Sequence, residues 1–445
     1  MGKARKRRQK KLSAEPVETV IENLSHEGRG VARIEGKTVF VACALAGEKL
    51  RFKYTKVNRR FDEGMAESIL EPSPIRVEPE CEFFSVCGGC NLQHMQAEEQ
   101  IKFKQSVLLE NFEHIGKVVP EEILEPLTGP VWNYRHKARL GVKYVPKKGR
   151  VLVGFREKFS PYVADMISCK VLHESVGEKL HLLSGLIETL SIKDKIPQIE
   201  VAIGDNECSM IFRVLESLSE EDISKLIAFG DEQNIRILQQ PQGPDSVQPI
   251  TDNADDLLCY IIEKHNVDFY FKANDFTQIN PQINRKMIDR AIEFLDLQKE
   301  DIVLDLFCGL GNFTLPISRY VDRIIGVEGD DDLVERAKEN ACKNGIDNAS
   351  FYKADLTQDL TGHSWLQEKP NKILIDPPRS GAIEVIPQII SMKPQKILYI
   401  SCHPATLARD AGVLVNDHGY KLVKAGVMDM FPHTAHVESI ALFEK

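Results

Sequence analysis

The sequence predicts three successive regions: a small β-barrel, a central α+β region and a doubly wound, mostly parallel α/β domain. Short alternating strand patterns crowd into residues 17–70, and a proline-rich stretch followed by three closely spaced cysteines comes next. From Asp301 to the end, apolar strand runs alternate with helical patterns. This alternation is typical of a parallel sheet covered by helices on both faces. With 445 residues, the chain is long enough for two or three such domains.

The composition is that of a globular protein with real cores. Hydrophobic residues make up 42% and charged residues 28% of the chain, which are ordinary values. No window approaches the roughly 18 uninterrupted apolar residues of a membrane span. The basic N-terminus is not followed by an apolar run, so we expect no secretion signal. The expected location is the cytoplasm, where the ten cysteines would stay reduced.

Charge is distributed unevenly along the chain. The net charge of −9, taken alone, argues against a nucleic-acid partner. However, residues 1–60 hold sixteen Lys and Arg against six Asp and Glu, and residues 131–160 hold nine against one. This asymmetry suggests two basic surfaces on an acidic body. A solvated tail and a solvated hairpin would give the same pattern, so charge alone leaves both interpretations open.

The first two segments are a tail and a barrel. Residues 1–13 are a basic arm that we expect to be disordered. Residues 14–72 contain short alternating runs punctuated by Gly28, Gly36 and Gly47. Several short strands in so few residues predict a closed barrel of the OB-like kind. Barrels of this kind bind nucleic acid on one face.

The central domain, residues 73–270, begins with a cysteine cluster. Cys81, Cys87 and Cys90 lie in one loop whose glycines permit tight wrapping. Cys169 is the best candidate for a fourth ligand. Reduced thiols at this density indicate a metal site rather than disulfides. Four thiolates suit either a [4Fe–4S] cluster or a structural zinc ion, and the spacing does not decide between them.

The last domain, residues 271–445, contains a glycine-rich turn between a strand and a helix, at Asp305–Phe313. Such a turn lets the backbone approach a ligand closely. The third glycine of a dinucleotide fingerprint is missing, which weakens an NAD interpretation. Glu328, Asp355 and Asp376 end successive strands, so they collect at the edge where open α/β sheets bind ligands. Taken alone, each acid is explained as a cap of the next helix, but together with the turn they predict a site for S-adenosylmethionine (SAM).

A cysteine and a glutamate are expected at the same edge. Cys402 lies where the predicted strand KILYIS meets its loop, and Glu438 lies near the start of a final strand, VESIALF, that we expect to run antiparallel beside it. An antiparallel strand begins where its parallel neighbours end, so the two side chains converge. A thiolate that adds to C6 of uracil activates C5 toward a methyl donor, and a base must then remove the C5 proton. Taken singly, Cys402 would be a structural cysteine and Glu438 a surface acid.

Four segments of this domain resemble signature segments of the RNA uracil-C5 methyltransferases: SCHPATLARD, DPPRSG, DLFCGLGNFTLP and MFPHTAHVES. The resemblance spans roughly residues 270–445 and implies a Rossmann-like, SAM-dependent methyltransferase domain. It implies that Cys402 is the nucleophile and Glu438 the base. The family commonly has Asn after the nucleophile, whereas this chain has His403, a change that bears on the local hydrogen bonding.

The same resemblance implies a set of cofactor contacts. The SAM-binding residues carried over from the family are Gln278, Phe307, Asn312, Glu328, Asp355 and Asp376. Asp376 is also credited in the family with holding the target uracil, so its role could be either.

The N-terminal half adds to the resemblance. Residues 14–72 are similar to the TRAM domain, an RNA-binding module. The barrel, the cysteine motif and the catalytic domain together resemble the branch of the family that methylates a uridine of 23S rRNA and carries a [4Fe–4S] cluster. The resemblance therefore implies Cys81, Cys87, Cys90 and Cys169 as cluster ligands. It implies 23S rRNA as the partner of a monomeric protein that needs no membrane.

Three alternatives stay open. The enzyme could act on tRNA or on another rRNA uridine. A DNA cytosine-C5 methyltransferase shares the thiolate chemistry but would carry its cysteine after the fourth strand, where this chain has DPPRSG. A non-catalytic iron–sulfur RNA-binding protein is the third, and the presence of both Cys402 and Glu438 argues against it.

Overall fold

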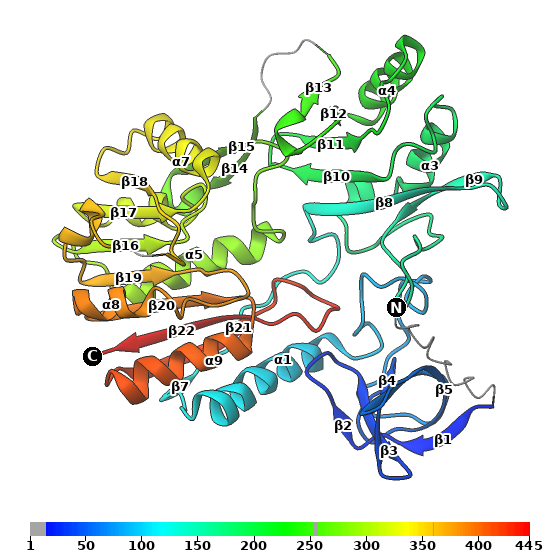
Figure 1. Ribbon diagram of the computed structural model, residues 1–445, viewed down its shortest axis with the longest axis horizontal. Coiled ribbons are helices and arrows are strands. Elements are labelled where there is room, and N and C mark those ends of the chain that lie inside the picture. The colour runs from blue at the N-terminus through cyan, green and yellow to red at the C-terminus, as the bar shows by residue number, and fades with distance from the viewer. Residues whose placement is uncertain (1–14, 252–256, 359) are drawn as a thin grey trace, which may run out of the picture. The chain divides into compact units, whose positions relative to one another are not determined.

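The computed structural model describes residues 15–251, 257–358 and 360–445, and the predicted basic arm, residues 1–13, lies outside them (Figure 1). Among the described residues, no helix combines the length and the apolar character that a membrane crossing requires. The chain forms two compact units, which are described in turn.

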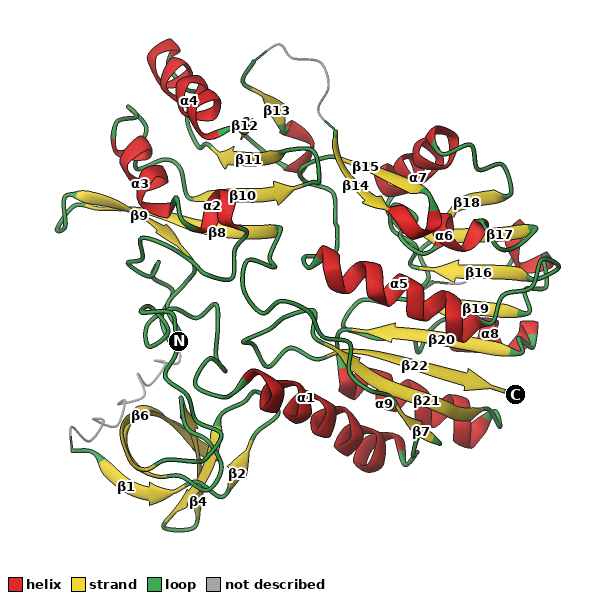
Figure 2. Ribbon diagram, turned by 180° about the vertical axis from the view of Figure 1, so that it is seen from behind, coloured by secondary structure: helices red, strands yellow, loops and turns green. Residues whose placement is uncertain are grey.

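The first unit comprises the chain up to Lys102, Arg156–Tyr162 and His433–Ala435. Its six strands pair in the order β1-β5-β6-β4-β3-β2 and form one strongly bent sheet (Figure 2). Bending is possible because β6 passes close over β5: a Cβ on Gly64 would lie 2.5 Å from the ring of Phe52. The strands are β1 (Val17–Val20), β2 (Asn23–Leu24), β3 (Gly30–Ile34), β4 (Lys37–Ala42), β5 (Lys49–Val57) and β6 (Phe61–Glu71).

The interior of this bent sheet is a small apolar core. Its buried side chains come from the inward positions of β3, β4 and β5 and from the adjoining loops: Ile21, Ala32, Val39, Val41, Ala44, Leu50 and Phe52. Alternation of buried and exposed residues along β5 matches the period of two expected for a half-buried strand. Helix α1 (Ala97–Asn111) begins in this unit and continues into the second.

The second unit contains a six-stranded and an eight-stranded sheet. The first is a mixed sheet of the central region, in the order β13-β12-β11-β10-β8-β9, accompanied by α2, α3 and α4. The strands are β8 (Lys137–Val145), β9 (Arg150–Gly154), β10 (Gln198–Ile203), β11 (Cys208–Arg213), β12 (Ile235–Gln240) and β13 (Gln248–Pro249). The helices are α2 (Glu174–Gly177), α3 (Leu180–Glu188) and α4 (Glu220–Gln233).

The second sheet of this unit has eight strands in the order β18-β17-β16-β19-β20-β22-β21-β7 (Figures 1 and 2). The five neighbouring strands β18, β17, β16, β19 and β20 are parallel. Strand β22 is inserted antiparallel between β20 and β21. This confirms the predicted antiparallel final strand. The strands are β7 (Glu122–Ile123), β16 (Ile302–Leu306), β17 (Arg323–Glu328), β18 (Ala349–Lys353), β19 (Lys372–Ile375), β20 (Lys396–Ser401), β21 (Lys421–Met428) and β22 (Glu438–Glu444).

Helices cover both faces of this sheet, and α5 and α9 lie on opposite faces (Figures 1 and 2). The doubly wound α/β prediction is therefore confirmed. The parallel strands β16, β17, β19 and β20 are buried on both faces, as their continuous apolar sequences require, whereas the edge strand β18 is only partly buried. The helices are α5 (Pro281–Leu295), α6 (Thr314–Ser318), α7 (Asp331–Lys343), α8 (Ile386–Met392) and α9 (Pro404–Gly412).

A hairpin links the two sheets of the second unit along the chain. Strands β14 (Leu258–Ile262) and β15 (Val267–Phe271) pair antiparallel. The side-chain amide of Asn340 on α7 accepts from the backbone N–H of Tyr270 at 2.9 Å and donates to its carbonyl at 3.1 Å. An amide that satisfies both groups of an edge residue fastens the hairpin to α7.

Candidate active site at the carboxyl edge of the eight-stranded sheet

Cys402 and Glu438 lie at neighbouring positions of two paired strands. Strand β20 ends at Ser401 and β22 begins at Glu438, and Ser401 pairs with Ser439 in antiparallel register. The hydroxyl of Ser439 donates to the carbonyl of Ser401 at 3.1 Å, which reinforces this register. The thiol one residue beyond β20 therefore lies beside the carboxyl at the start of β22, although the two are distant along the chain.

Burial and like charge dominate the electrostatics of the pair. Burial, then the charges of Glu438 and Asp376, raise the pKa of the Cys402 thiol to about 11, while Arg379 lowers it. Glu438 is only 4% exposed, and burial followed by Asp376 raises the pKa of its carboxyl well above the usual value. Two acids that share a buried site resist simultaneous ionisation. Arg379 is the cation that offsets this, because it lowers the pKa of both groups.

His403 follows Cys402, at a position where the family commonly has asparagine, and both residue types can cap the next helix. His403 is the N-cap of α9: its backbone is extended, and its Nδ1 accepts from the backbone N–H of Thr406 at 3.3 Å. Asparagine is among the favoured N-cap residues because its side-chain oxygen accepts the same bond. Pro404 follows at the first helical position, where a missing N–H costs nothing. The substitution therefore preserves the cap and the local path of the chain.

The DPPRSG segment is held against β20 and α9 by Asp410. This fully buried carboxylate accepts from the hydroxyl of Tyr399 at 2.7 Å and from the backbone N–H of Ala382 at 2.8 Å. The hydroxyl of Thr406 also donates to the carbonyl of Arg379 at 3.2 Å. These bonds fix the loop that contains Asp376 and Arg379 beside the reacting pair.

The glycine-rich turn has the strained backbone of a ligand-binding loop. Phe307, Gly309 and Gly311 have φ values of 63°, 56° and 93°. A positive φ is uncommon for a phenylalanine, and such strain concentrates at functional sites. The backbone N–H of Gly309 donates to the carboxylate of Glu328 at 3.0 Å, so the turn and the end of β17 are joined.

The predicted SAM contacts follow the strand ends. Glu328 ends β17, Asp355 comes two residues after β18, and Asp376 comes directly after β19. Burial raises the pKa of Asp376 to about 7. The carboxylate of Asp355 accepts from the backbone N–H and the hydroxyl of Thr357, so a local turn also explains its presence. Gln278 is half-buried in the loop before α5.

The side chain of Asn312, a predicted SAM contact, also makes structural hydrogen bonds. Its side chain exchanges two hydrogen bonds of 2.9 Å with Asn284 on α5, and it accepts from the hydroxyl of Tyr260 at 3.0 Å. These partners occupy the amide oxygen and one hydrogen of the amide nitrogen, so a contact between Asn312 and a cofactor would come from the second N–H of its side chain or from its backbone. The sequence carries no signal for this network because the partners lie on separate elements.

Asp305 is a buried acid that sequence reasoning placed in the turn without assigning it a role. It is fully buried, and one carboxyl oxygen accepts from the hydroxyl of Thr314 at 2.5 Å. The other oxygen has no hydrogen-bond partner within the described residues. Burial raises the pKa of this carboxyl to about 8. In the sequence, the only sign that Asp305 is special is its position directly before the glycine-rich turn.

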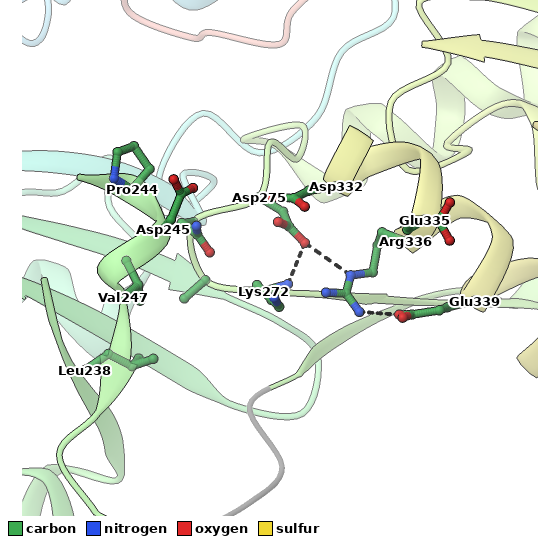
Figure 3. A pocket seen from close by; sticks show the side chains of 12 residues that line it. Leu238, Pro244, Asp245, Val247, Lys272, Asp275, Asp332, Glu335, Arg336 and Glu339 are labelled. Atoms are coloured by element: carbon green, nitrogen blue, oxygen red, sulfur yellow. Dashed lines mark hydrogen bonds and ion pairs between the residues drawn. The ribbon is translucent and has the colours of Figure 1, made fainter. Parts of the chain in front are cut away.

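A polar hollow of about 470 Å³ lies beside the N-terminal turns of α7 (Figure 3). Arg336 crosses it and pairs with Asp275 and Glu339. Its lining includes none of the six predicted SAM contacts. The hollow therefore contributes nothing to the SAM assignment.

The four cysteines of the predicted metal centre are divided between the two units. Cys81, Cys87 and Cys90 belong to the first and Cys169 to the second. Within the part of the chain that the structure describes, no group of three or more His, Cys, Asp or Glu side chains has the arrangement of a metal site. Burial raises the pKa of the Cys87 thiol, while the N–H of Gly89, which donates to its sulfur at 3.3 Å, lowers it.

Comparisons with known proteins agree with this geometry. Residues 246–445 match the family described as tRNA (Uracil-5-)-methyltransferase, and residues 16–66 match the TRAM domain. The TRAM match confirms the predicted resemblance of the barrel. The solved structure of Pyrococcus abyssi tRNA (uracil-54, C5)-methyltransferase with S-adenosyl-L-homocysteine superposes with a TM-score of 0.73 at 23% identity, covering 96% of this chain and 100% of that chain. This similarity shows a shared fold.

Two relatives are similar over their whole length. The 23S rRNA (uracil(1939)-C(5))-methyltransferase RlmD of Alkalilimnicola ehrlichii is 51% identical over 439 residues, covering 99% of each chain. The RlmD of Methylococcus capsulatus is 48% identical over 445 residues, covering 100% of each chain. With about half of its residues identical across both full lengths, the chain belongs to the RlmD family of RNA uracil-C5 methyltransferases.

Proposed function

We propose that this protein methylates C5 of a uridine in 23S rRNA, with Cys402 as nucleophile and Glu438 as base. The observation that carries the proposal is the pairing of β20 with β22, which sets a thiol and a buried carboxyl side by side at the ligand edge of the sheet. The full-length RlmD relatives support 23S rRNA as the substrate class. We place the reaction in the cytoplasm and the active form as a monomer.

Cys402 and Glu438 act in different steps of the methyl transfer. The Cys402 thiolate forms a bond to C6 of uracil, and the displaced electron pair moves through the ring to C5. SAM, when bound, supplies an electrophilic methyl group to C5. Glu438 then takes the C5 proton, and the C–S bond breaks, which returns the thiolate and the C5–C6 double bond. The high pKa of the Glu438 carboxyl makes it a strong base once it is ionised.

The cofactor end of the site fits a nucleoside sulfonium ligand. The positive-φ turn at Phe307–Gly311 exposes backbone close to the strand end, and the Glu328 carboxylate beside it suits ribose hydroxyls. We assign Gln278, Phe307, Asn312, Glu328, Asp355 and Asp376 to SAM binding. Asp376 lies close enough to act electrostatically on both reacting groups, so we also assign it to hold the uracil ring.

We propose that Cys81, Cys87, Cys90 and Cys169 hold a [4Fe–4S] cluster that orders the chain and takes no part in methyl transfer. The Gly89 N–H directed at the sulfur of Cys87 supports a thiolate at this position, because it lowers the pKa of the thiol. Iron and sulfide analysis of anaerobically purified protein tests the assignment. Zinc in place of iron would defeat it.

RNA phosphates are proposed to contact the barrel and the β8–β9 hairpin. The hairpin side chains Arg139, Lys148 and Arg150 are exposed but already pair with Glu200 or Asp165. Exposed pairs of this kind contribute little, so a phosphate can replace the carboxylate. Binding to RNA should therefore weaken steeply as salt rises, and a flat response would contradict phosphate contacts.

Covalent trapping tests the catalytic assignment. With 5-fluorouridine-substituted 23S rRNA fragments and SAM, fluorine at C5 blocks proton removal, so a denaturant-resistant complex should accumulate. Cys402→Ala should abolish the complex, whereas Cys342→Ala, at an exposed cysteine on α7, should leave it intact. A pure RNA-binding protein would never form the complex.

The second candidate substrate is a tRNA uridine. It is favoured by the tRNA description of the matched family. Parallel trapping with 5-fluorouridine tRNA distinguishes the two, because the preferred RNA should be trapped at lower concentration. Exclusive trapping of tRNA would replace 23S rRNA in the proposal.

A further inference from the structure

The side-chain amide of Asn312 is bonded by two other elements of the second unit. It forms a closed pair with the amide of Asn284 on α5, in which each amide donates one hydrogen bond of 2.9 Å to the other. The hydroxyl of Tyr260 on β14 donates to the same Asn312 oxygen at 3.0 Å. The oxygen of Asn312 therefore accepts two hydrogen bonds, and its nitrogen keeps one N–H that neither partner uses.

The amide pair alone does not determine which end of Asn312 is oxygen and which is nitrogen. If both amides flipped together, the two bonds between Asn284 and Asn312 would form again with donors and acceptors exchanged. Tyr260 removes this ambiguity, because its buried hydroxyl needs an acceptor for its proton. A flipped Asn312 would direct an N–H at that hydroxyl and leave the proton without an acceptor. Since an unsatisfied buried donor is costly, one orientation of the amide dominates.

The two partners of Asn312 are themselves held in place. The ring of Tyr260 stacks on Phe269 of β15, with ring centroids 4.7 Å apart and an angle of 12° between the planes. Burial raises the pKa of the Tyr260 hydroxyl well above its ordinary value, so the group keeps its proton. Asn284 is only 4% exposed and lies in the first turns of α5. Both partners are therefore fixed beside the glycine-rich turn.

We infer that Tyr260 is a positioning residue for the methyl donor: it fixes the amide of Asn312 so that the remaining N–H, and not the oxygen, is offered to SAM. The inference rests on the proposed role of Asn312 in SAM binding. Asn312 directly follows Gly311, whose φ of 93° belongs to the positive-φ turn that we assign to the cofactor. A donor that is oriented before the ligand arrives loses little freedom when it binds, which favours affinity.

The competing explanation is that Tyr260 only stabilises the fold. Tyr260→Phe keeps the stacked ring and removes the hydroxyl, so Asn312 keeps its pair with Asn284 but is free to flip. Tyr320→Phe is the matched control, because the Tyr320 hydroxyl shares a hydrogen bond of 2.8 Å with His265 at the turn of the same hairpin. A purely structural role would lower the urea midpoint and leave the affinity of the folded protein unchanged.

The experiment is a calorimetric titration of the full-length proteins with S-adenosyl-L-homocysteine in the absence of RNA, together with urea unfolding of each protein. For Tyr260→Phe we expect the Kd to rise about three- to tenfold, and for Tyr320→Phe we expect no change. Asn312→Ala should raise the Kd at least as much as Tyr260→Phe. Adding Tyr260→Phe to Asn312→Ala should change nothing further, because the hydroxyl acts only through that amide.

The remaining outcomes all count against the inference, and they separate it from the proposed function. An unchanged Kd in Tyr260→Phe would overturn the positioning role, even if the urea midpoint falls. Additive losses of affinity in the double variant would show that Tyr260 acts by a route other than Asn312. Normal binding by Asn312→Ala would remove that contact alone, whereas an unsubstituted protein that binds no S-adenosyl-L-homocysteine would remove the proposed SAM site as well.

Discussion

The buried acid before the glycine turn makes stability depend on pH in a defined direction. Asp305 has a pKa of about 8 in the folded chain against an ordinary value of 3.8. The folded state therefore keeps a proton that the unfolded state has lost, and stability falls as pH rises until the folded pKa is passed. The slope is roughly 1.4 kcal/mol per pH unit. Between about pH 6 and about pH 9, Asp305 should thus remove about 3 kcal/mol of stability.

Asp305→Asn isolates this contribution, because asparagine resembles the neutral acid and still accepts from Thr314. The advantage of the variant over the unsubstituted protein should grow by about 3 kcal/mol from about pH 6 to about pH 9. Urea unfolding followed by tryptophan fluorescence suits the measurement, since both tryptophans, Trp132 and Trp365, belong to the second unit. The charge of Asp376 contributes to the raised pKa of Asp305, so the measured difference includes the coupling between these two carboxyls. A difference that stays constant with pH would refute a neutral Asp305.

Three further outcomes are expected at the reacting pair. Glu438→Gln should form the methylated adduct but release it slowly, so covalent enzyme–RNA complex accumulates on denaturing gels, whereas Glu444→Gln at the other end of β22 should turn over normally. His403→Asn should leave the urea midpoint unchanged, and His403→Ala should destabilise by about 1 kcal/mol through loss of the cap; equal midpoints would mean that the cap is dispensable. Arg379→Met should raise the pKa of the Cys402 thiol and slow its alkylation by iodoacetamide about three- to tenfold at fixed pH, and an unaltered pH profile would remove Arg379 from the site.

The regular part of the fold was predictable because its signals are local. Apolar runs alternating with amphipathic helices predict parallel strands, and acids placed after those runs must collect at one edge. The positions of Glu328 and Asp376 follow from this rule alone. Glu438 required one more step, the antiparallel direction of β22, which a single unpaired strand does not reveal. The usual arrangement of methyltransferase sheets, which end with an antiparallel strand beside the fifth, supplied that direction.

The parts that were not predictable depend on contacts between distant segments. Nothing local indicates that Arg156–Tyr162 packs with the cysteine loop, since its sequence reads as the end of a basic hairpin. The bonds of Asn312 to Asn284 and Tyr260 join three elements, and each partner is an ordinary polar residue in the sequence. Long-range pairing of this kind is set by tertiary packing, which local patterns do not encode.

The relation between Cys402 and Glu438 depends on strand register more than on any direct bond between them. A shift of one residue would turn Glu438 to the opposite face of the sheet. Six of the seven residues of β22 are buried, so alternation of polar and apolar side chains does not fix its register. The Ser439–Ser401 hydrogen bond and the irregular pairing of β21 at Leu422 and Lys424 are the features that distinguish one register from another. Catalytic geometry is therefore a property of the packed core, and substitutions within β22 far from the substrate should affect methyl transfer before they unfold the chain.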